Sequence, residues 1–485
     1  MRTQAMGGNN ISAKFAAALA LIVCVLNATA AAQTFDNVIA ALETDQVTVW
    51  RIGSDPAAPT FSIIVGTGVR DLRGVQELMQ TSGFAERVNS LTFTIDNHDF
   101  SLGMPPVRLR DLLPLTSLER LTLQYTAAED WPALSRLSSI RKLTLHGEAL
   151  ANISMLAGVN QVETLELENM QIASLTPLSS MAGLRSLSIE QMIVEDGGSA
   201  ALPQLRSLTL REMPQASLDA VAGMPNLESV TLQENRLSDI SPLLRLARLS
   251  SIEVRGQSAP DLGPLLQIQG LRALSLNVQT ATIQEARICA ERPGLRTIRL
   301  LGVHDVSSLA IFDRCTDLTN LELTSAAVLD LSPVATHTAL EELAIHPVVR
   351  RNGVVPIADL GPLAALTNLR RLSLRGVAAT DFSPLIGLRN IEMLDLSNTQ
   401  LRSLDIIRNM PNLRVLNISG TRVVDLSALA SAPNLETLNI ANTRVRDISV
   451  LAGLERLTSV ITLNAPVRDH SVLDRLPFLA TRSDR

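Results

Sequence analysis

The side chains that most often perform catalysis are scattered along this chain and form no motif. The six histidines lie in different parts of the sequence, at His98, His146, His304, His337, His346 and His470. The sequence contains no HExxH zinc motif, no phosphate-binding P-loop, no GxSxG nucleophile turn and no dinucleotide-binding glycine fingerprint. Because no base accompanies a nucleophile and no ligands stand at metal-binding spacing, we expect neither enzymatic activity nor a cofactor.

Two cysteines, Cys289 and Cys315, stand 26 residues apart in the body of the chain. This separation is close to one period of the repeat described below, so neighbouring coils could bring the two sulfurs together. A disulfide would require an oxidising compartment. The alternative, which the sequence leaves open, is a pair of buried free thiols.

Charged side chains gather in a few places and could bind a ligand. Glu166, Glu168 and Glu190 fall on neighbouring predicted strands, where their carboxylates could hold Ca²⁺, meet a basic partner or simply face solvent. Farther along the chain, Glu322 and Glu342 are followed by arginines. A guanidinium group can form two parallel hydrogen bonds with a carboxylate, so Glu322 and Glu342 are candidates for cross-strand ion pairs with Arg371 and Arg375.

Two insertions lengthen the repeat and are candidate binding loops, since binding residues concentrate in loops on a rigid scaffold. One spans Asn97–Val107. The other spans His346–Val355 and contains Arg350 and Arg351 before an Asn-Gly turn. We expect these two arginines to hold acidic groups of a partner, with Arg371 and Arg375 extending the positive surface. Pairing of Arg350 and Arg351 with Glu341 and Glu342 is the competing interpretation.

The composition indicates a repetitive architecture. Hydrophobic residues make up 46% of the chain but aromatic residues only 2%, so the core must consist of Leu, Ile, Val and Ala. A net charge of -6 argues against a nucleic-acid binder that needs a broad basic surface.

A short apolar segment, Leu-x-x-Leu-x-Leu with Ile or Val allowed, recurs mostly every 22 residues and must position all of these side chains. We call the second apolar residue of each copy its anchor. The seventeen anchors are Leu91, Leu121, Leu143, Leu165, Leu187, Leu208, Val230, Ile252, Leu274, Ile298, Leu321, Leu343, Leu372, Leu394, Leu416, Leu438 and Val460. Each begins a short alternating strand, and stacked copies predict a parallel β-sheet over a continuous core.

The return half of the repeat predicts short 3₁₀ turns on the convex side. Asp-x-Ser-Pro recurs at 239–242, 330–333 and 381–384, where Asp accepts backbone N–H groups and Pro opens the turn. Too few residues remain for a long helix. Asp395, Asn417 and Asn439 occupy equivalent positions, which predicts a hydrogen-bonded ladder between strands.

The segment LETLNIANTRVRDISVLA, at residues 435–452, resembles the 22-residue leucine-rich repeat of bacterial internalin-type proteins. The resemblance runs from residue 88 to about residue 475. It implies an α/β solenoid, a leucine-rich repeat arc with a parallel concave β-sheet and 3₁₀ turns on the convex side. It also implies a secreted or surface protein that binds protein partners on its concave side. The sequence shows neither a C-terminal immunoglobulin-like domain nor a wall-sorting pattern, so host-receptor binding is not expected.

Residues 1–32 are expected to be a signal peptide, with a cationic start, a 12-residue apolar run and small residues before Gln33. Residues 33–87 are then an N-terminal cap with a degenerate repeat at Ile63–Val65, and 88–465 the repeat domain. Residues 466–485, with Leu473 and Phe478, are expected to close the other end. We expect a secreted or periplasmic bacterial protein without stable membrane insertion.

The leading functional hypothesis is a non-enzymatic module that recognises a protein partner. No aromatic residue falls on the predicted concave face, and protein-binding sites favour Trp, Tyr and Arg, so a plain solvated sheet is an alternative interpretation there. The competing functions are an envelope scaffold without a dedicated ligand, and a glycan-binding protein. Nucleic acid is not an expected partner.

Overall fold

The computed structural model describes most of the repeat region. The described residues are 47–51, 61–65, 87–94, 107–125, 128–147, 153–194, 200–213, 218–234, 239–256, 265, 267–278, 294–302, 308–326, 328, 330–347 and 357–483. The expected signal peptide, Cys289, Arg350, Arg351 and nearly all of both insertions lie outside them. The chain forms two compact units, Met1–Leu227 and Glu228–Arg485, which are described separately below.

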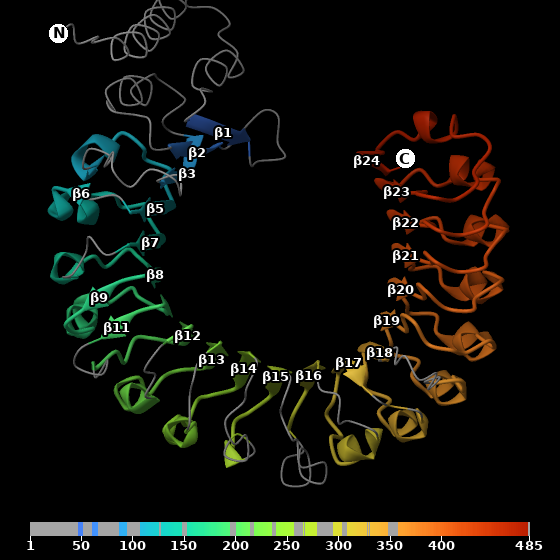
Figure 1. The fold of residues 1–485 in the computed structure, drawn as a ribbon, viewed down its shortest axis with the longest axis horizontal. Helices are drawn as coiled ribbons and strands as arrows, with labels where there is room; N and C mark the ends of the chain where they lie inside the picture. Colours follow the sequence, from blue (N-terminus) through green and yellow to red (C-terminus); the bar gives the residue numbers. More distant parts are fainter. Residues whose placement is uncertain are drawn as a thin grey trace, which may run out of the picture. The chain divides into compact units, whose positions relative to one another are not determined.

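The first unit is built on a stack of short strands (Figure 1). β1 (Val47–Arg51) pairs antiparallel with β2 (Phe61–Val65), and the later neighbours pair in parallel. These are β3 (Val88–Phe93), β5 (Arg120–Gln124), β7 (Lys142–His146), β8 (Thr164–Glu168), β10 (Ser186–Glu190) and β12 (Ser207–Arg211). Ile63 pairs with Leu91, so the expected degenerate repeat is a strand of this sheet.

Short 3₁₀ turns form the return half of the coils in the first unit. They are η2 (Leu109–Leu112), η3 (Trp131–Arg136), η4 (Ser154–Leu156), η5 (Thr176–Ser180) and η6 (Leu218–Gly223). Two small parallel pairs lie beside the main sheet: β4 (Val107–Arg108) with β6 (Ala128–Glu129), and β9 (Gln171–Ile172) with β11 (Ile193–Val194).

The second unit repeats this plan with shorter strands toward its end. Its strands are β13 (Ser229–Gln233), β14 (Ser251–Gly256), β15 (Ala273–Val278), β16 (Thr297–Leu301), β17 (Asn320–Ala326), β18 (Glu342–Pro347), β19 (Arg371–Ser373), β20 (Met393–Asp395), β21 (Val415–Asn417), β22 (Thr437–Asn439), β23 (Ser459–Ile461) and β24 (Thr481–Ser483). Consecutive strands pair in parallel from β13 to β24.

The turns of the second unit are again 3₁₀, as the repeat length predicted. They are η7 (Ser241–Arg245), η9 (Leu309–Phe312), η10 (Ser332–Thr336), η11 (Gly361–Ala365), η12 (Ser383–Gly387), η13 (Asp405–Asn409), η14 (Ser427–Ser431), η15 (Ser449–Gly453) and η16 (Leu473–Arg475). Asp239 accepts the Ser241 N–H at 2.8 Å, and Asp330 and Asp381 accept equivalent bonds. These bonds lower the pKa of the three carboxyls.

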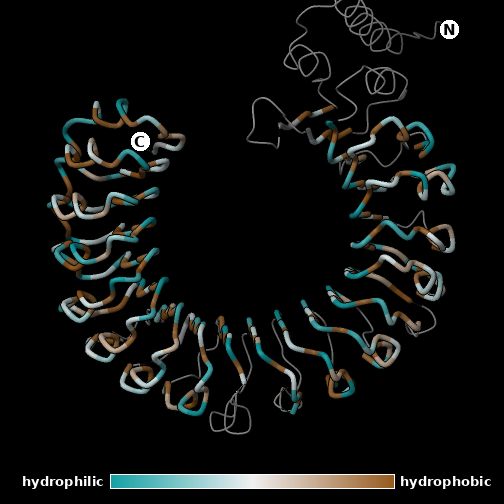
Figure 2. Tube along the Cα trace, turned by 180° about the vertical axis from the view of Figure 1, so that it is seen from behind, coloured by the Kyte–Doolittle hydropathy of each residue, from teal (hydrophilic) through white to brown (hydrophobic). Residues whose placement is uncertain are grey.

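The anchors form the core of both units. All seventeen are 2% exposed or less, and each pairs with the anchor of the next described strand of its unit. Leu416 is fully buried between Leu394 and Leu438. Figure 2 shows the resulting pattern, because hydrophobic stretches recur in every coil. The predicted parallel sheet, core positions and convex 3₁₀ turns are therefore confirmed.

The expected ladder through Asp395, Asn417 and Asn439 is wrong. Each of these side chains accepts a hydrogen bond from the backbone N–H two residues later: Ser397 at 2.8 Å, Ser419 at 3.1 Å and Ala441 at 3.0 Å. Their bonds therefore run along the chain instead of between strands. These local turns begin where the three-residue strands end, and backbone bonds between coils continue beside them, as from Leu396 N–H to the Asn417 carbonyl at 2.9 Å.

The structure also bears on the expected disulfide, the expected C-terminal cap and the expected lack of a membrane span. Cys315 is buried and disulfide-bonded. At the end of the chain Leu473 is buried, but Phe478 is 67% exposed and therefore does not close the core. No helix among the described residues combines the length and apolarity needed to cross a bilayer.

Candidate functional site

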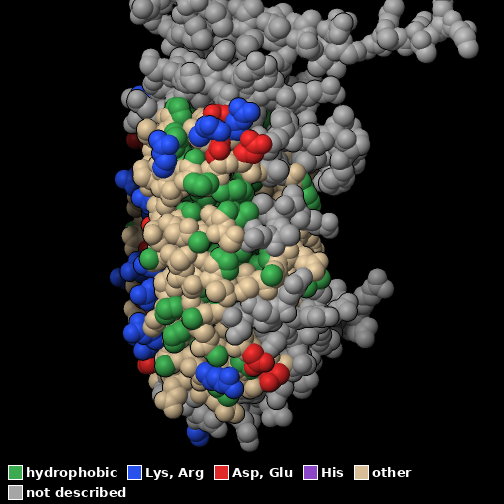
Figure 3. All heavy atoms as spheres, turned by 90° about the vertical axis from the view of Figure 1, so that its left-hand side faces the viewer, with side chains coloured by type: hydrophobic (Ala, Val, Ile, Leu, Met, Phe, Trp, Pro, Cys, Tyr) green, Lys and Arg blue, Asp and Glu red, His purple; other side chains and the backbone are tan. Residues whose placement is uncertain are grey.

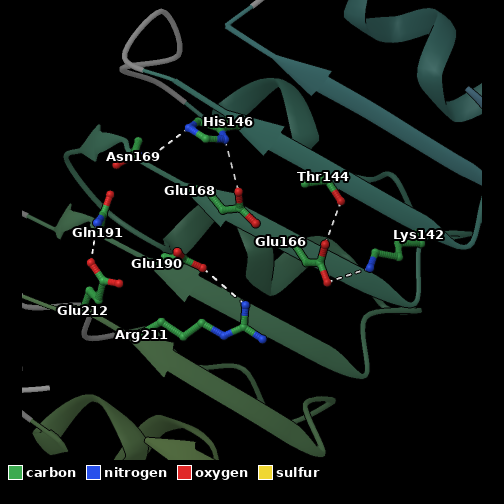
Figure 4. A network of polar contacts seen from close by, with 10 residues as sticks. All are labelled: Lys142, Thr144, His146, Glu166, Glu168, Asn169, Glu190, Gln191, Arg211 and Glu212. Atoms are coloured by element: carbon green, nitrogen blue, oxygen red, sulfur yellow. Dashed lines mark hydrogen bonds and ion pairs between the residues drawn. The ribbon is translucent and has the colours of Figure 1, made fainter. Parts of the chain in front are cut away.

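A network of polar side chains lies across β7, β8, β10 and β12 of the first unit (Figure 4). Parallel pairing in exact register aligns His146 with Glu168, Glu168 with Glu190, and Glu190 with Arg211. Neighbouring strands lie about 4.8 Å apart, so these four side chains share one face. The predicted cluster of Glu166, Glu168 and Glu190 is thus brought together, and it includes cations and a histidine that the sequence reasoning missed.

Glu166 is held by two partners on β7. Its Oε1 lies 2.7 Å from Lys142 Nζ, and its Oε2 accepts the hydroxyl of Thr144 at 2.8 Å. Lys142 is the only lysine of the chain besides Lys14. Glu166 is therefore neutralised within the sheet.

His146 occupies the end of β7 and is nearly enclosed, with 15% of its side chain exposed. Its Nε2 lies 2.8 Å from the Tyr125 hydroxyl and 2.7 Å from Asn169 Nδ2, and the two rings are 4.3 Å apart. Because the amide Nδ2 can only donate, Nε2 must accept, which leaves the proton on Nδ1. Burial lowers the pKa of His146 below its ordinary value, and the nearby Glu190 partly offsets this effect.

Glu168 is the least compensated carboxylate of the network. His146 Nδ1 lies 3.2 Å from its Oε2 without hydrogen-bond geometry, and the neutral ring supplies no positive charge. Burial, followed by the charges of Glu190 and Glu166, raises the pKa of Glu168, while Arg211 and Lys142 oppose the rise. Glu190 instead accepts from Arg211 Nη1 at 3.3 Å. Within the described residues, Arg211 Nε and His146 Nδ1 have no hydrogen-bond partner although both are buried.

The backbone next to this network is left-handed at residues of types that rarely adopt this conformation. The fourth residue after the anchor has a positive φ, at 51° for Tyr125, 52° for Asn169, 49° for Gln191 and 49° for Glu212. A left-handed residue other than Gly, Asn or Asp costs about 1 kcal/mol. Side-chain contacts accompany all four left-handed residues: Tyr125 and Asn169 contact His146, and Gln191 donates to Glu212.

The metal interpretation of the acidic cluster finds no support in the described residues. Among them, no group of three or more His, Cys, Asp or Glu side chains is arranged to hold an ion. Glu166 and Glu190 have protein cations as partners, so the arrangement suits recognition of another charged group better than a cage of oxygens.

The second unit contains the other predicted cluster. His346, at the end of β18, contacts the Ser373 hydroxyl at 2.7 Å, and burial lowers the pKa of His346. Arg371 lies 3.7 Å from Glu342, as the cross-strand pairing predicted. Arg375 is exposed and has no ion pair among the described residues. Arg350 and Arg351 lie outside these residues, so their part in this surface stays a prediction.

One predicted pair is wrong in its partner. Glu322 lies 3.4 Å from Arg299 on the preceding strand and forms no ion pair with Arg371 or Arg375. Parallel register places Arg299 directly opposite Glu322, whereas both later arginines are separated from it by β18. Arg299, the nearer cation, therefore forms the ion pair with Glu322.

The outward-facing surface of the first unit offers fewer polar groups. Figure 3 shows mainly apolar and uncharged side chains there, with Lys or Arg and Asp or Glu side by side in a few small groups. The ion pairs of this unit include Arg108 with Glu129 at 3.7 Å and Arg110 with Asp130 at 2.6 Å.

A signal for the missed residues exists in the repeat itself. Aligning the coils on their anchors shows that the fourth following position is Gly or Asn in nine of the seventeen coils, as at Gly376, Asn398, Gly420, Asn442 and Asn464. Among the described residues, Tyr125, Gln191, Glu212 and Glu234 have a positive φ at this position without being Gly or Asn. Residues that violate a local backbone preference cluster at functional sites, and the first three of these lie beside the network, whereas Glu234 lies outside it.

Comparisons with known proteins support the fold. A sequence model of two leucine-rich repeats matches residues 389–431. No curated protein matches the chain. Among solved structures, the mouse RP105/MD-1 complex superposes with a TM-score of 0.55 at 15% identity, covering 84% of this chain and 80% of the other. The Drosophila Toll–Spatzle complex gives 0.50 at 14% identity, with 89% and 67% covered.

The internalin inlF from Listeria monocytogenes is similar at 23% identity over 77% of this chain and 92% of its own, with a TM-score of 0.41. Together with the repeat model and the parallel strands, the comparisons with TM-scores of 0.50 and above show that the chain is a leucine-rich repeat solenoid with 3₁₀ turns.

Proposed function

We propose that this chain is a non-enzymatic recognition module that binds a protein partner on the strand face of its repeats. The observation that carries the proposal is the network around Glu168. A rigid, in-register sheet presents the Glu168 carboxylate, 25% exposed, whose nearest partner is a neutral histidine. Its oxygens keep acceptor capacity that an incoming hydrogen-bond donor can use.

The partner group best suited to this face is basic. Four carboxylates, Glu166, Glu168, Glu190 and Glu212, stand against the two cations Lys142 and Arg211. A guanidinium or ammonium placed beside Glu168 and Glu190 would balance the excess negative charge. The protein partners of the solved relatives, MD-1 and Spatzle, belong to those complexes and indicate only that this fold can present a binding surface.

The face around His346, Arg371 and Arg375 is a second candidate, suited to acidic groups. Its supporting observation is the exposed guanidinium of Arg375, which lacks an ion pair among the described residues. Arg350 and Arg351 of the nearby insertion would extend this surface if they point outward, as their Asn-Gly turn predicts.

We propose a secreted or periplasmic location, with residues 1–32 removed as a signal peptide. A disulfide at Cys315 is consistent with an oxidising compartment. Fractionation of the producing cells and N-terminal sequencing of the recovered protein test both statements together. Recovery of the uncut chain from the cytosol would contradict them.

The test of recognition compares matched variants against a partner captured from the native envelope fraction. Glu168→Lys places a positive charge at the proposed contact, whereas Glu119→Lys makes the same change at an exposed residue just before β5. We expect Glu168→Lys to weaken binding by roughly tenfold or more and Glu119→Lys to leave it unchanged. Equal binding by both variants would reject the site.

The competing functions give different outcomes in the same set of experiments. The scaffold hypothesis predicts no saturable partner in that fraction. A glycan-binding protein would retain specific sugars on a glycan array, although the described strands from β5 to β23 contain none of the aromatic platforms that usually stack on sugar rings.

A further inference from the structure

The last repeats of the second unit form a side ladder just after their strands end. Arg422 N–H donates to the Leu401 carbonyl at 2.9 Å, Arg444 N–H to Val423 at 3.1 Å and Arg468 N–H to Arg446 at 3.0 Å. These inter-repeat bonds stack extended segments of successive coils as in a sheet, about 4.8 Å apart. The sixth and eighth residues after each anchor point outward from this ladder, while the seventh is buried at Leu401, Val423 and Val445.

Arginine fills most of these outward positions. We call the surface the arginine ladder and define it as Arg402, Arg422, Arg444, Arg446 and Arg468, with Val424 in its midst. All five arginines are exposed, and Val424 is 54% exposed. Within the continuously described stretch 357–483, none of the five guanidinium groups has an ion pair or a hydrogen bond.

Several other arginines of the same repeats are paired. Arg408 lies 2.9 Å from Asp405, Arg370 lies 2.9 Å from Glu392, and Arg414 contacts Glu436. Arg375, Arg389 and Arg456 of the same stretch also have no ion pair among the described residues, so the ladder is distinguished by the stacking of its arginines on successive coils.

The carboxylates nearest in sequence to the ladder already have partners. Asp425 accepts both the N–H and the hydroxyl of Ser427, at 2.8 and 2.9 Å. Asp447 and Asp469 accept the N–H of Ser449 and Ser471, each at 2.8 Å. These bonds lower the pKa of all three carboxyls and hold them at the start of the turns.

Neighbouring members of the ladder repel each other. Arg422 and Arg444, and likewise Arg446 and Arg468, occupy equivalent positions on successive coils, and like charges so placed oppose folding slightly. The core beneath them is complete without any contribution from these side chains, since Leu401, Val423 and Val445 are buried. A binding role would account for a repulsive arrangement that the fold does not need.

We propose that the arginine ladder binds an acidic polypeptide segment of a partner, with an aliphatic residue of that segment seated on Val424 and acidic residues on either side. Guanidinium groups bind carboxylates with two parallel hydrogen bonds, and none of the five has such a partner among the residues that the structure describes. This surface lies beside the strands instead of on their inner face, so the inference is independent of the site around Glu168.

The exposed Val424 favours an acidic polypeptide over other kinds of anionic ligand. A sulfated sugar or a phosphate surface gains nothing from an exposed aliphatic residue in the centre of its site. Single-stranded nucleic acid binds by stacking its bases on aromatic side chains, and the ladder contains none.

Fluorescence anisotropy with a labelled peptide of sequence EEDLEDE tests the proposal on the full-length protein. The double variant Arg444→Glu and Arg446→Glu should weaken peptide binding by roughly a hundredfold, since each charge-assisted contact contributes roughly tenfold. The matched control, Arg389→Glu with Arg456→Glu, changes the net charge equally at two exposed arginines outside the ladder and should bind like the unaltered chain. Val424→Ser should weaken binding of EEDLEDE but not of EEDSEDE.

Circular dichroism and thermal melting of each variant show whether it remains folded. Three results would overturn the proposal: no binding of EEDLEDE to the unaltered chain, equal losses in the ladder and control variants, or tighter binding of heparin, phosphatidylglycerol vesicles or oligo-dT than of the peptide. Because capture of a partner at Glu168 is measured separately, failure here leaves the proposed function standing, and the reverse also holds.

Discussion

The repeats from β5 to β12 and those from β19 to β23 make the same turn after each strand with different residues. The later repeats place Gly or Asn at the left-handed position, whereas the earlier ones place Tyr125, Gln191 and Glu212 there as well as Gly147 and Asn169. The side ladders differ too: Arg108 and Arg110 of the first unit pair with Glu129 and Asp130, while the arginine ladder of the second unit is unpaired within the described stretch 357–483.

The difference indicates where each set of repeats departs from what folding requires. In the first unit the departure is a strained backbone beside a polar network. In the repeats from β19 to β23 the left-handed position carries Gly or Asn, and the departure is a surface of repelling charges. Both lie outside the anchor positions, which are alike in the two units.

Substitutions in the core should have the same effect in both units, because both sets of repeats are built on the same kind of buried anchor. Leu416→Ala and Leu187→Ala remove fully buried anchors and should each lower the free energy of unfolding of their own unit by about 2–5 kcal/mol. Chemical denaturation followed by hydrogen exchange resolves the two units. A much smaller loss at Leu187 would show that the earlier repeats are packed differently.

A buried hydroxyl distinguishes the later repeats. Thr421 is 4% exposed and donates its hydroxyl to the Ile418 carbonyl at 2.6 Å, and Thr399 and Thr443 make equivalent bonds. Thr421→Val keeps the shape but leaves the buried carbonyl without this bond, which should cost about 1–3 kcal/mol. Thermal melting against the exposed control Thr458→Val measures the effect, and equal stability of the two variants would contradict it.

The units should also respond differently to acid. Burial lowers the pKa of His146 below its ordinary value of 6.5, so the unfolded chain takes up a proton first as the pH falls. Stability of the first unit should therefore decline from about pH 6.5 toward the lowered pKa, by at most about 1.4 kcal/mol per pH unit for one proton. Protonation of Glu168, whose pKa is raised, should reverse part of the loss at lower pH.

The second unit should also lose stability below about pH 6.5, because burial lowers the pKa of His346 as it does that of His146. At lower pH no raised carboxyl reverses this loss in its described residues, and the lowered pKa values of Asp425, Asp447 and Asp469 stabilise the fold above the ordinary Asp value of 3.8. That contribution is lost as the pH falls through their folded pKa values. Hydrogen exchange at pH 7, 5.5 and 3.5 separates the two responses. The variant His146→Gln should remove the decline of the first unit near pH 6 if the assignment is correct.

The smallest effects concern the left-handed turn position. Gln191→Gly should relieve the strain at a φ of 49° and raise stability by about 0.5–1 kcal/mol, less what the contact with Glu212 contributes. Asn442→Ala, at a φ of 55°, should have the opposite sign. The melting temperatures of these two variants, compared with that of the unaltered chain, give the sign of each effect. Destabilisation by Gln191→Gly would mean that the network, not the backbone, dominates there.

Much of the fold follows from local periodicity. The 22-residue recurrence of Leu143, Leu165 and Leu187 predicts parallel register, because each apolar residue needs an equivalent neighbour to cover it. The Asp-x-Ser-Pro turns follow from a bond that spans only two residues. The adjacency of Glu168 and Glu190 could be predicted for the same reason, since register is inherited from the anchors.

The sequence did not predict which of several neighbouring groups a side chain would bind. Glu322 pairs with Arg299 and not Arg371, and Asn417 bonds to its own chain and not to Asn439. A repeat places several partners within a few ångströms, and small differences in distance and side-chain direction then decide between them.

The sequence by itself determined the solenoid, its core and the turns, because those features depend on spacing along the chain. Only the tertiary structure decided that His146 is neutral beside Glu168, and that five outward arginines lack partners within the described stretch 357–483. The physical reason is that burial, proton position and ion pairing depend on atoms from three or four coils at once. No single repeat contains that information.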